Sequence, residues 1–169
     1  MTANLTYWAP ADAHVYTIGT VIGMAGDRYG PQAGETPARH QFAAWADHFG
    51  TAARAFFVTA DSMGYDFARL APVEFAFIDG AHDLAHVQAD TANVYRATAP
   101  GGVITWHDFD SPVPWVEVRA AIERARFPEP VYHVAGTEVA FLVKRDPAAA
   151  VPVRPPRRLS GRWLVAGGN

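Results

Sequence analysis

The composition fits a single folded domain of moderate size. The chain has 169 residues, of which 50% are hydrophobic and 18% are charged, a balance typical of globular rather than disordered proteins. A net charge of -3 and a pI near 6.1 give no reason to expect nucleic acid or an acidic membrane as a partner. Because the chain has no cysteine, disulfides, thiolate metal sites and a cysteine nucleophile are excluded.

The sequence also carries no membrane or export signal. No apolar run approaches the roughly 18 residues of a membrane-spanning helix. The N-terminus lacks the basic flank and the apolar core of a signal peptide. We therefore expect a cytoplasmic protein that binds neither membrane nor nucleic acid. Formation of a homo-oligomer stays open.

The first half of the chain holds two strand patterns and one helix pattern. Residues 13–18 and 54–59 are rich in β-branched and aromatic side chains, and each run predicts a strand. Residues 19–38 contain five glycines and two prolines, which indicates a long loop, either a lid or an ordinary excursion. Residues 39–49 repeat aromatic side chains at helical spacing and predict a helix closed by Gly50.

The second half continues the alternation of strands and helices. Residues 73–79 form a near-continuous apolar run, as expected of a strand buried on both faces of a parallel sheet. A helix is predicted over 84–98, with Asp83 as its N-cap, and a strand over 103–107. A second helix is predicted to open at Pro112 or Pro114 and to end near 126.

Two short strands and a polar tail complete the predicted organisation. Residues 131–134 and 139–144 flank an Ala-Gly-Thr turn and predict an antiparallel edge pair. Residues 146–169 are rich in proline, arginine and glycine, and indicate an extended tail. The pattern therefore predicts a doubly wound α/β domain over 1–145, with a mostly parallel sheet and a C-terminal antiparallel hairpin, followed by a tail.

Polar side chains follow two neighbouring strands of this predicted sheet. Asp79 and Gly80 end one strand, and His107 and Asp108 end the next, after the turn A-P-G-G. Ligands of open α/β sheets bind at the carboxyl ends of strands, so these groups mark a candidate site. His82 lies three residues after Asp79 and carries the side chain best suited to take up a proton near neutral pH.

Each of these residues also has a structural interpretation. Asp79 could cap a turn, and His82 could be a surface turn residue. His107 could bond a neighbouring backbone group and bind nothing, because imidazole suits transition metals better than Mg²⁺. Functional and structural interpretations of these side chains both stand at this point.

In its motifs the chain resembles the class I S-adenosylmethionine-dependent methyltransferases, in particular a bacterial branch of small O-methyltransferases. The resemblance rests on the order and spacing of several short motifs, over about 12–145. These are V-Y-T-I at 15–18, A-D-S at 60–62, D-F at 66–67, F-I-D-G-A-H at 77–82, A-D-T at 89–91, A-P-G-G-V-I-T-W-H-D at 99–108 and Y-H-V-A-G-T at 132–137.

The resemblance implies S-adenosylmethionine as the cofactor and assigns residues to it. Ile18 and Gly19 would lie at the cofactor where the first predicted strand ends. The adenine edge would be formed by Asp61, Ser62 and Met63. Asp79 and Gly80 would lie beneath the cofactor near the transferred methyl group.

The resemblance also implies a metal-assisted reaction on a small hydroxylated acceptor. A divalent ion such as Mg²⁺ would be held by Asp79, His107 and Asp108. His82 would be the catalytic base, and Asp79 would take part in catalysis through the ion that orients the acceptor hydroxyl.

The chain departs from the family pattern at its start. The glycine-rich loop that follows the family's first strand is absent, and Gly19 stands where the family carries a ribose-binding carboxylate. The first strand would be central, so its absence would leave neighbouring strands with unpaired backbone groups. The chain is then truncated, pairs with another chain, or binds the cofactor poorly.

Three functions remain open from the sequence. The first is a metal-assisted O-methyltransferase, and the second is a non-catalytic remnant or partner subunit with the same fold. The third, which the A-P-G-G-V-I motif fits less well, is a metal-dependent hydrolase built on Asp79, His82, His107 and Asp108.

Overall fold

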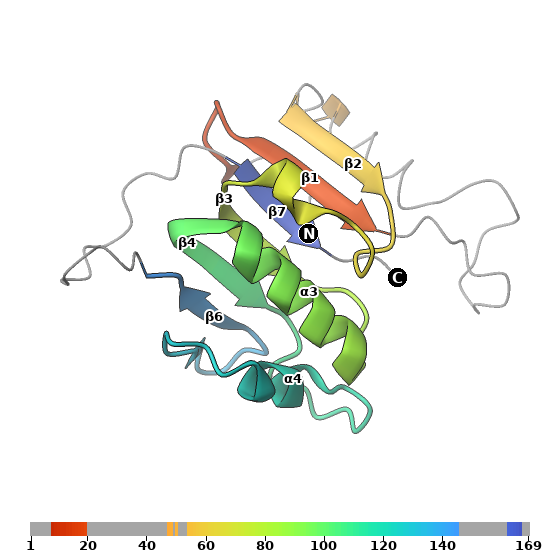
Figure 1. Cartoon of the computed structure of the whole chain (residues 1–169), viewed down its shortest axis with the longest axis vertical. Coiled ribbons are helices and arrows are strands. Elements are labelled where there is room, and N and C mark those ends of the chain that lie inside the picture. The colour runs from red at the N-terminus through yellow and green to blue at the C-terminus, as the bar shows by residue number, and fades with distance from the viewer. Residues whose placement is uncertain (1–7, 20–46, 49, 51–53, 146–161, 167–169) are drawn as a thin grey trace, which may run out of the picture.

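A computed structural model describes residues 8–19, 47–48, 50, 54–145 and 162–166, and these form one mixed seven-stranded sheet with helices packed on it (Figure 1). The strand order across the sheet is β2-β1-β7-β3-β4-β6-β5. The strands are β1 His14–Gly19, β2 Ala55–Thr59, β3 Val73–Ile78, β4 Thr98–Trp106, β5 Tyr132–His133, β6 Ala140–Val143 and β7 Arg162–Ala166.

The sheet has a parallel part and an antiparallel edge, as the sequence predicts. β1 pairs in parallel with β2 and β7, and β3 pairs in parallel with β7 and β4. β6 runs antiparallel to β4, and β5 runs antiparallel to β6. The carboxyl ends of the parallel strands therefore all meet at one edge of the sheet.

Strand β7 corrects the prediction of an extended tail over 146–169 that contributes nothing to the sheet. Arg162–Ala166 lies between β1 and β3, in the position that the sequence left without a strand. Its sequence R-W-L-V-A is a short apolar run inside a stretch dominated by proline, arginine and glycine, so the overall composition hid it. Backbone pairing with two neighbours stabilises it there.

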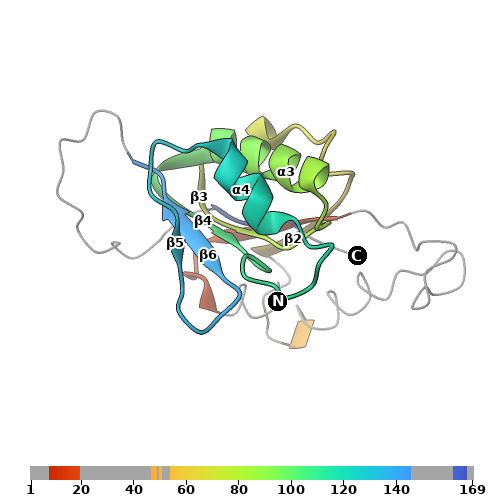
Figure 2. The ribbon, with the colours of Figure 1, turned by 90° about the horizontal axis from the view of Figure 1, so that it is seen from below.

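The described helices cover one face of the sheet (Figure 2). They are α3 Leu84–Ala97 and α4 Val118–Ala125, with a short 3-10 helix, η2, at Phe67–Leu70. The predicted loop over 20–38 and nearly all of the predicted helix over 39–49 lie outside the described residues. In the part of the chain that the structure describes, no helix is long and apolar enough to cross a membrane.

Helix α3 forms where the sequence predicts it, because its cap and its apolar face agree. The Asp83 side chain accepts a hydrogen bond from His86 N at 3.2 Å and closes the first turn. The buried face includes Val87, Thr91 and Val94. It packs on strand β4, where Trp106 is fully buried and donates its Nε1–H to Thr91 Oγ1 at 2.9 Å.

Helix α4 is shorter than predicted and begins at Val118 rather than at Pro112 or Pro114. A residue before proline is disfavoured in the helical conformation, so the two prolines hold the preceding segment in a turn. Glu117 then bonds to the loop before α3, with its N–H donating to His82 O at 2.8 Å. Tertiary contacts rather than helical ones therefore set the start of α4.

The A-P-G-G motif lets strand β4 start at Thr98, five residues earlier than predicted. A Cβ on Gly102 would lie 2.6 Å from Thr98 Cγ2, 2.9 Å from Ala99 O and 3.0 Å from Val73 O. Gly101 has φ +82, a conformation that L side chains rarely adopt. The two glycines thus allow close approach and a sharp bend beside β3.

Candidate functional site

The strand ends bring the predicted site residues to one edge of the sheet. Gly19, at the end of β1, accepts a hydrogen bond through its carbonyl from Ala60 N at 3.1 Å, just after β2. At the other side, His107 N donates to Ile78 O at 3.0 Å and ties the ends of β3 and β4 together. The edge therefore has one part at β1 and β2 and another at β3 and β4.

The part at β3 and β4 holds a cluster of two carboxylates and two imidazoles. His82 Nε2 lies 2.8 Å from Asp108 Oδ2. His107 Nδ1 lies 2.9 Å from the same oxygen and 3.7 Å from Asp79 Oδ1. The structure therefore brings these four side chains together, whereas their roles remain a prediction.

Asp108 is the centre of this cluster and has an unusual backbone. Its φ is 56, in the left-handed region, which aspartate and asparagine tolerate better than most residues. The next residue, Phe109, donates its N–H to Glu138 O at 2.9 Å. This bend at the end of β4 presents the Asp108 carboxylate to both histidines.

Charge interactions shift two pKa values in the cluster. The Asp108 carboxylate in close contact raises the pKa of His107, although partial burial opposes this. Burial alone would raise the pKa of Asp108, but contacts with His107 and His82 outweigh it, and the pKa of Asp108 lies below its usual range. The arrangement favours an ionised Asp108 and the protonated form of His107.

Glu138 joins the cluster, although sequence reasoning missed it. Two sets of side chains place one ligand atom each within 4.8 Å of one another, Asp79–His82–Asp108 and His107–Asp108–Glu138. The antiparallel register of β4 and β6 explains the second set. Trp106 at the end of β4 pairs with Ala140 at the start of β6, so Asp108, two residues after Trp106, lies near Glu138, two residues before Ala140. Only that register, and no local motif, could have indicated Glu138.

A small hollow lies between this cluster and the core. Asp79, Gly80, His82, His107 and Asp108 line its polar side. Trp106 and residues of the two helices line its apolar side. The hollow is therefore lined by both histidines and both carboxylates of the cluster.

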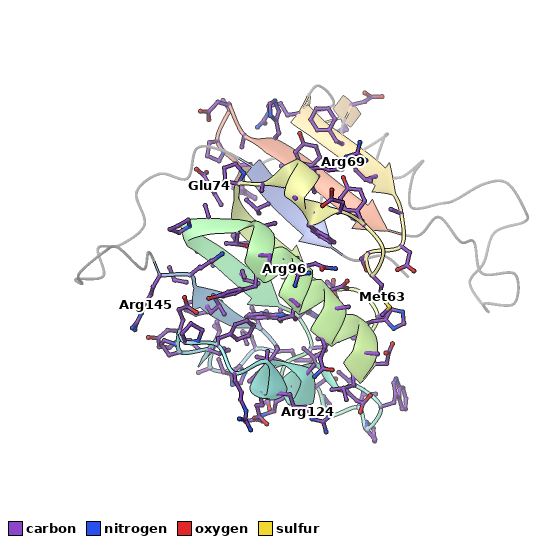
Figure 3. The ribbon with its side chains drawn as sticks, viewed as in Figure 1. Met63, Arg69, Glu74, Arg96, Arg124 and Arg145 are labelled. Carbon is purple, nitrogen blue, oxygen red and sulfur yellow. The ribbon has the colours of Figure 1, made fainter. Side chains whose placement is uncertain are left out.

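The part of the edge at β1 and β2 holds the predicted adenine residues. Asp61 Oδ1 accepts a hydrogen bond from Met63 N at 2.9 Å, which fixes the turn after β2. Met63 projects from this turn beside α3 (Figure 3) and is 43% exposed. Helix α3 supports the turn from behind, where Asn93 Nδ2 donates to Ser62 O at 3.3 Å.

Asp90 of α3, which lies in the A-D-T motif at 89–91 but received no role from the sequence, also supports this turn. Its side chain hydrogen-bonds the Ser62 side chain, and burial raises the pKa of Asp90. Asp90 is 2% exposed, and its Oδ1 has no hydrogen-bond partner. A buried aspartate on the apolar face of a helix was the available signal, because such a residue needs a reason to be there.

Ile18 and Gly19 are both buried, although the sequence predicts that they contact the cofactor. Ile18 is 1% exposed and packs in the main hydrophobic core. Gly19 is also buried and has no side chain. Any contact of these two residues with a cofactor would therefore come from the backbone.

Comparison with known proteins assigns the chain to a family. The family model described as a methyltransferase domain matches residues 7–109, which is more than half of the chain. None of the curated proteins compared matches the sequence.

Several solved structures share the fold at low sequence identity. CalS11, a TDP-rhamnose 3'-O-methyltransferase of calicheamicin biosynthesis, is 12% identical with a TM-score of 0.58, over 85% of this chain and 76% of that one. An O-methyltransferase from Bacillus cereus in complex with SAH is 18% identical with a TM-score of 0.51, over 85% and 79%. MycE of mycinamycin biosynthesis, in complex with Mg, SAH and mycinamycin VI, is 18% identical with a TM-score of 0.50, over 89% and 50%.

These structural matches show the fold, and the family match shows the relationship. The chain belongs to the class I S-adenosylmethionine-dependent methyltransferases.

Proposed function

We propose that this protein transfers the methyl group of S-adenosylmethionine to a hydroxyl of a small molecule, with the help of a divalent ion. The observation that carries the proposal is the cluster of Asp79, His82, His107 and Asp108 at the carboxyl edge of β3 and β4. It combines a base with ligands for a cation, which are the two things that O-methylation of a hydroxyl needs. Family membership favours this reaction over a hydrolase built on the same side chains.

We assign the divalent ion to Asp79, His107 and Asp108. Each of the two sets of side chains with ligand atoms within 4.8 Å of one another, Asp79–His82–Asp108 and His107–Asp108–Glu138, contains two of these three residues. His107 Nδ1 is buried and makes no hydrogen bond of ordinary geometry, although both carboxylates lie close to it. A buried nitrogen without a hydrogen bond, beside two carboxylates, is what a metal ligand lacking its ion looks like. Mixed oxygen and nitrogen donors suit Mn²⁺, Fe²⁺ or Zn²⁺ at least as well as Mg²⁺. When bound, the ion would lower the pKa of an acceptor hydroxyl and orient it.

His82 would remove the acceptor proton. Its Nε2 bonds the Asp108 carboxylate, which requires a hydrogen on Nε2 and leaves the lone pair of the neutral ring on Nδ1. Asp108 would hold the imidazole in that tautomer and stabilise it once protonated. The acceptor oxygen then forms its bond to the methyl carbon as the carbon–sulfur bond breaks, with the electron pair left on sulfur, and alignment supplies most of the acceleration.

The other end of the edge would bind the adenosine part of the cofactor. The turn of Asp61, Ser62 and Met63 is fixed by its own hydrogen bonds and by α3. The acceptor class follows from relatives that act on small hydroxylated molecules, such as the TDP-rhamnose 3'-O-methyltransferase. We extend the proposal to a small-molecule acceptor and a cytoplasmic setting, with a homo-oligomer left open.

A non-catalytic role is the second candidate, and Gly19 favours it. The end of β1 carries no carboxylate for the ribose hydroxyls, because Gly19 stands there. In that case the fold would serve as a partner subunit and would show no methyl transfer with any acceptor.

A methyl-transfer assay separates these functions. We expect the chain to convert labelled S-adenosylmethionine to S-adenosylhomocysteine with an acceptor from a panel of catechols and sugars, and to stop when a chelator removes divalent ions. His82→Gln should lower kcat by about 10² to 10⁴. The matched control His14→Gln changes an exposed histidine at the amino end of β1, away from the site, and should retain activity within about twofold of the parent. Activity that survives the chelator would contradict the metal, and activity that survives His82→Gln would contradict the base.

A further inference from the structure

We propose that Glu117 is a positioning residue for His82, because it fixes the loop that carries this histidine to the start of helix α4. The inference rests on the proposed function, in which His82 is the base, and it names the residue that holds the base in place. Two hydrogen bonds carry it, one donated by the backbone of Glu117 and one accepted by its side chain.

Glu117 stands at the N-cap position of α4, yet its side chain caps the other helix. Its carbonyl accepts a hydrogen bond from Ala121 N at 2.9 Å and begins α4. Its carboxylate makes no capping hydrogen bond to α4. Instead, Oε2 accepts a hydrogen bond at 3.0 Å from Leu84 N, the first N–H of α3. An N-cap side chain usually bonds its own helix, so this one links the starts of two helices.

The backbone of Glu117 binds the same loop on the other side of Asp83. Its N–H donates to His82 O at 2.8 Å. The loop is therefore attached to Glu117 at His82 and again at Leu84. These two attachments leave the backbone of His82 little freedom to turn or to shift.

The start of α3 needs a group such as the Glu117 carboxylate. Asp83 accepts a hydrogen bond from His86 N at 3.2 Å, but the N–H of Leu84 requires another acceptor. Glu117 supplies it, and its negative charge suits the positive end of the helix dipole.

The residue that follows Glu117 anchors the start of α4 in the core. Val118 is 4% exposed and lines the hollow beside the cluster, opposite its polar residues. Val87 of α3 lines the same hollow, and the two helices pack together on one face of the sheet (Figure 2). Glu117 therefore ties the loop of His82 to a helix whose position the core fixes.

The ring of His82 is held by a separate contact. Its Nε2 lies 2.8 Å from Asp108 Oδ2, and this bond sets the direction in which the ring faces. The bonds of Glu117 set where the backbone of His82 lies. A shift of the backbone by about 1 Å would misalign the base, and misplacement of that size can lower a rate by up to about 10²-fold.

Three variants test this role by steady-state kinetics, each assayed at a temperature at which thermal unfolding shows it to be folded. Glu117→Ala should lower kcat by about tenfold, while KM for S-adenosylmethionine stays within about twofold, because the proposed adenosine site lies at the other end of the edge. Glu117→Gln keeps an oxygen that can accept the N–H of Leu84, and should retain at least about half of the parent kcat.

The matched control is Glu123→Ala, which removes the carboxylate of another exposed glutamate of α4. Glu123 bonds Arg119 of its own helix at 3.2 Å. This variant should leave kcat and KM within about twofold of the parent. An unchanged kcat in Glu117→Ala would overturn the proposal, as would a loss in Glu117→Gln as large as the loss in Glu117→Ala.

Nitrogen-15 NMR of the His82 ring gives a readout that needs no methyl transfer. At a pH at which imidazole is neutral, the parent should show one tautomer, with its hydrogen on Nε2, and Glu117→Ala should show a mixture of both. The signals of His82 are assigned by their loss in His82→Gln. Equal tautomer populations in the parent and in Glu117→Ala would overturn the proposal. If the parent transfers no methyl group, the proposed function fails, whereas the NMR comparison still decides whether Glu117 positions His82.

Discussion

Substituting Gly102 by alanine tests how the turn before the catalytic edge is built. The added Cβ would lie 2.6 Å from Thr98 Cγ2, 2.9 Å from Ala99 O and 3.0 Å from Val73 O. Two of these three atoms belong to backbone carbonyl groups of paired strands, which cannot rotate away as a side chain does. Overpacking of this kind costs about 1–3 kcal/mol, and we place Gly102→Ala at the upper end, about 3 kcal/mol.

Gly101→Ala is the matched control, because it adds the same methyl group one residue earlier. No atom lies within 4 Å of its added Cβ, so steric crowding adds nothing there. Its φ of +82 still strains an L residue, by about 1–2 kcal/mol. Gly102→Ala should therefore be the more destabilising of the two.

A second variant tests the mechanism. Thr98→Ser removes Cγ2 and keeps the hydroxyl that donates to Val94 O at 2.7 Å. In the Gly102→Ala background it should recover about 1 kcal/mol, because the two carbonyl contacts remain.

Urea unfolding followed by tryptophan fluorescence gives these free energies. For a chain of this length a loss of about 3 kcal/mol corresponds to a fall in Tm of roughly 6–12 °C. The reasoning is refuted if Gly102→Ala costs no more than Gly101→Ala. It is also refuted if Thr98→Ser restores the whole loss, because the carbonyl contacts would then cost nothing.

Three further predictions concern buried and charged side chains. Lys144→Met removes the hydrogen bonds that Nζ donates to Tyr95 O at 2.7 Å and to Thr98 O at 2.8 Å. The free energy of unfolding in urea should fall by about 2–4 kcal/mol, and a fall below about 0.5 kcal/mol would contradict this. Because burial raises the pKa of Asp90, the folded state favours its protonated form. The parent should therefore lose stability relative to Asp90→Asn as pH rises from about 3.8 through the folded pKa, and identical pH profiles of the two proteins would exclude this. Asp108→Asn should weaken Mn²⁺ binding by about tenfold or more while the chain stays folded, because asparagine tolerates φ 56; calorimetry with unaltered Mn²⁺ affinity would remove Asp108 from the metal site.

Local patterns predicted most of the fold because they depend on neighbours in the chain. The apolar runs placed β1, β2 and β3 within one residue of their observed bounds. Asp83 and the helical spacing after it placed α3 equally well. These elements carry their own signal, since burial of one face follows from periodicity alone.

Elements fixed by contacts between distant residues were predicted less well. β7 has five residues, and its partners in the sheet are about 85 to 150 positions away in the chain. The start of α4 depends on Glu117, which bonds the loop before α3 instead of continuing a helix. Neither contact is visible in a window of neighbouring residues.

The candidate site divides in the same way. Asp79, His82, His107 and Asp108 could be predicted because each follows a strand in a motif that the sequence shows. Glu138 could not, because the register of β4 and β6 brings it there. Asp90 gave a weaker signal, an acidic residue on a helix face that the structure buries.

The most direct test of the central claim is calorimetric titration of the 169-residue chain with S-adenosylhomocysteine, with and without Mg²⁺, after its cooperative unfolding has been verified. The account predicts saturable one-to-one binding, with no comparable heat when ATP replaces the ligand. A cooperatively folded chain that binds no S-adenosylhomocysteine under either condition would contradict the account and favour a non-catalytic member of the fold.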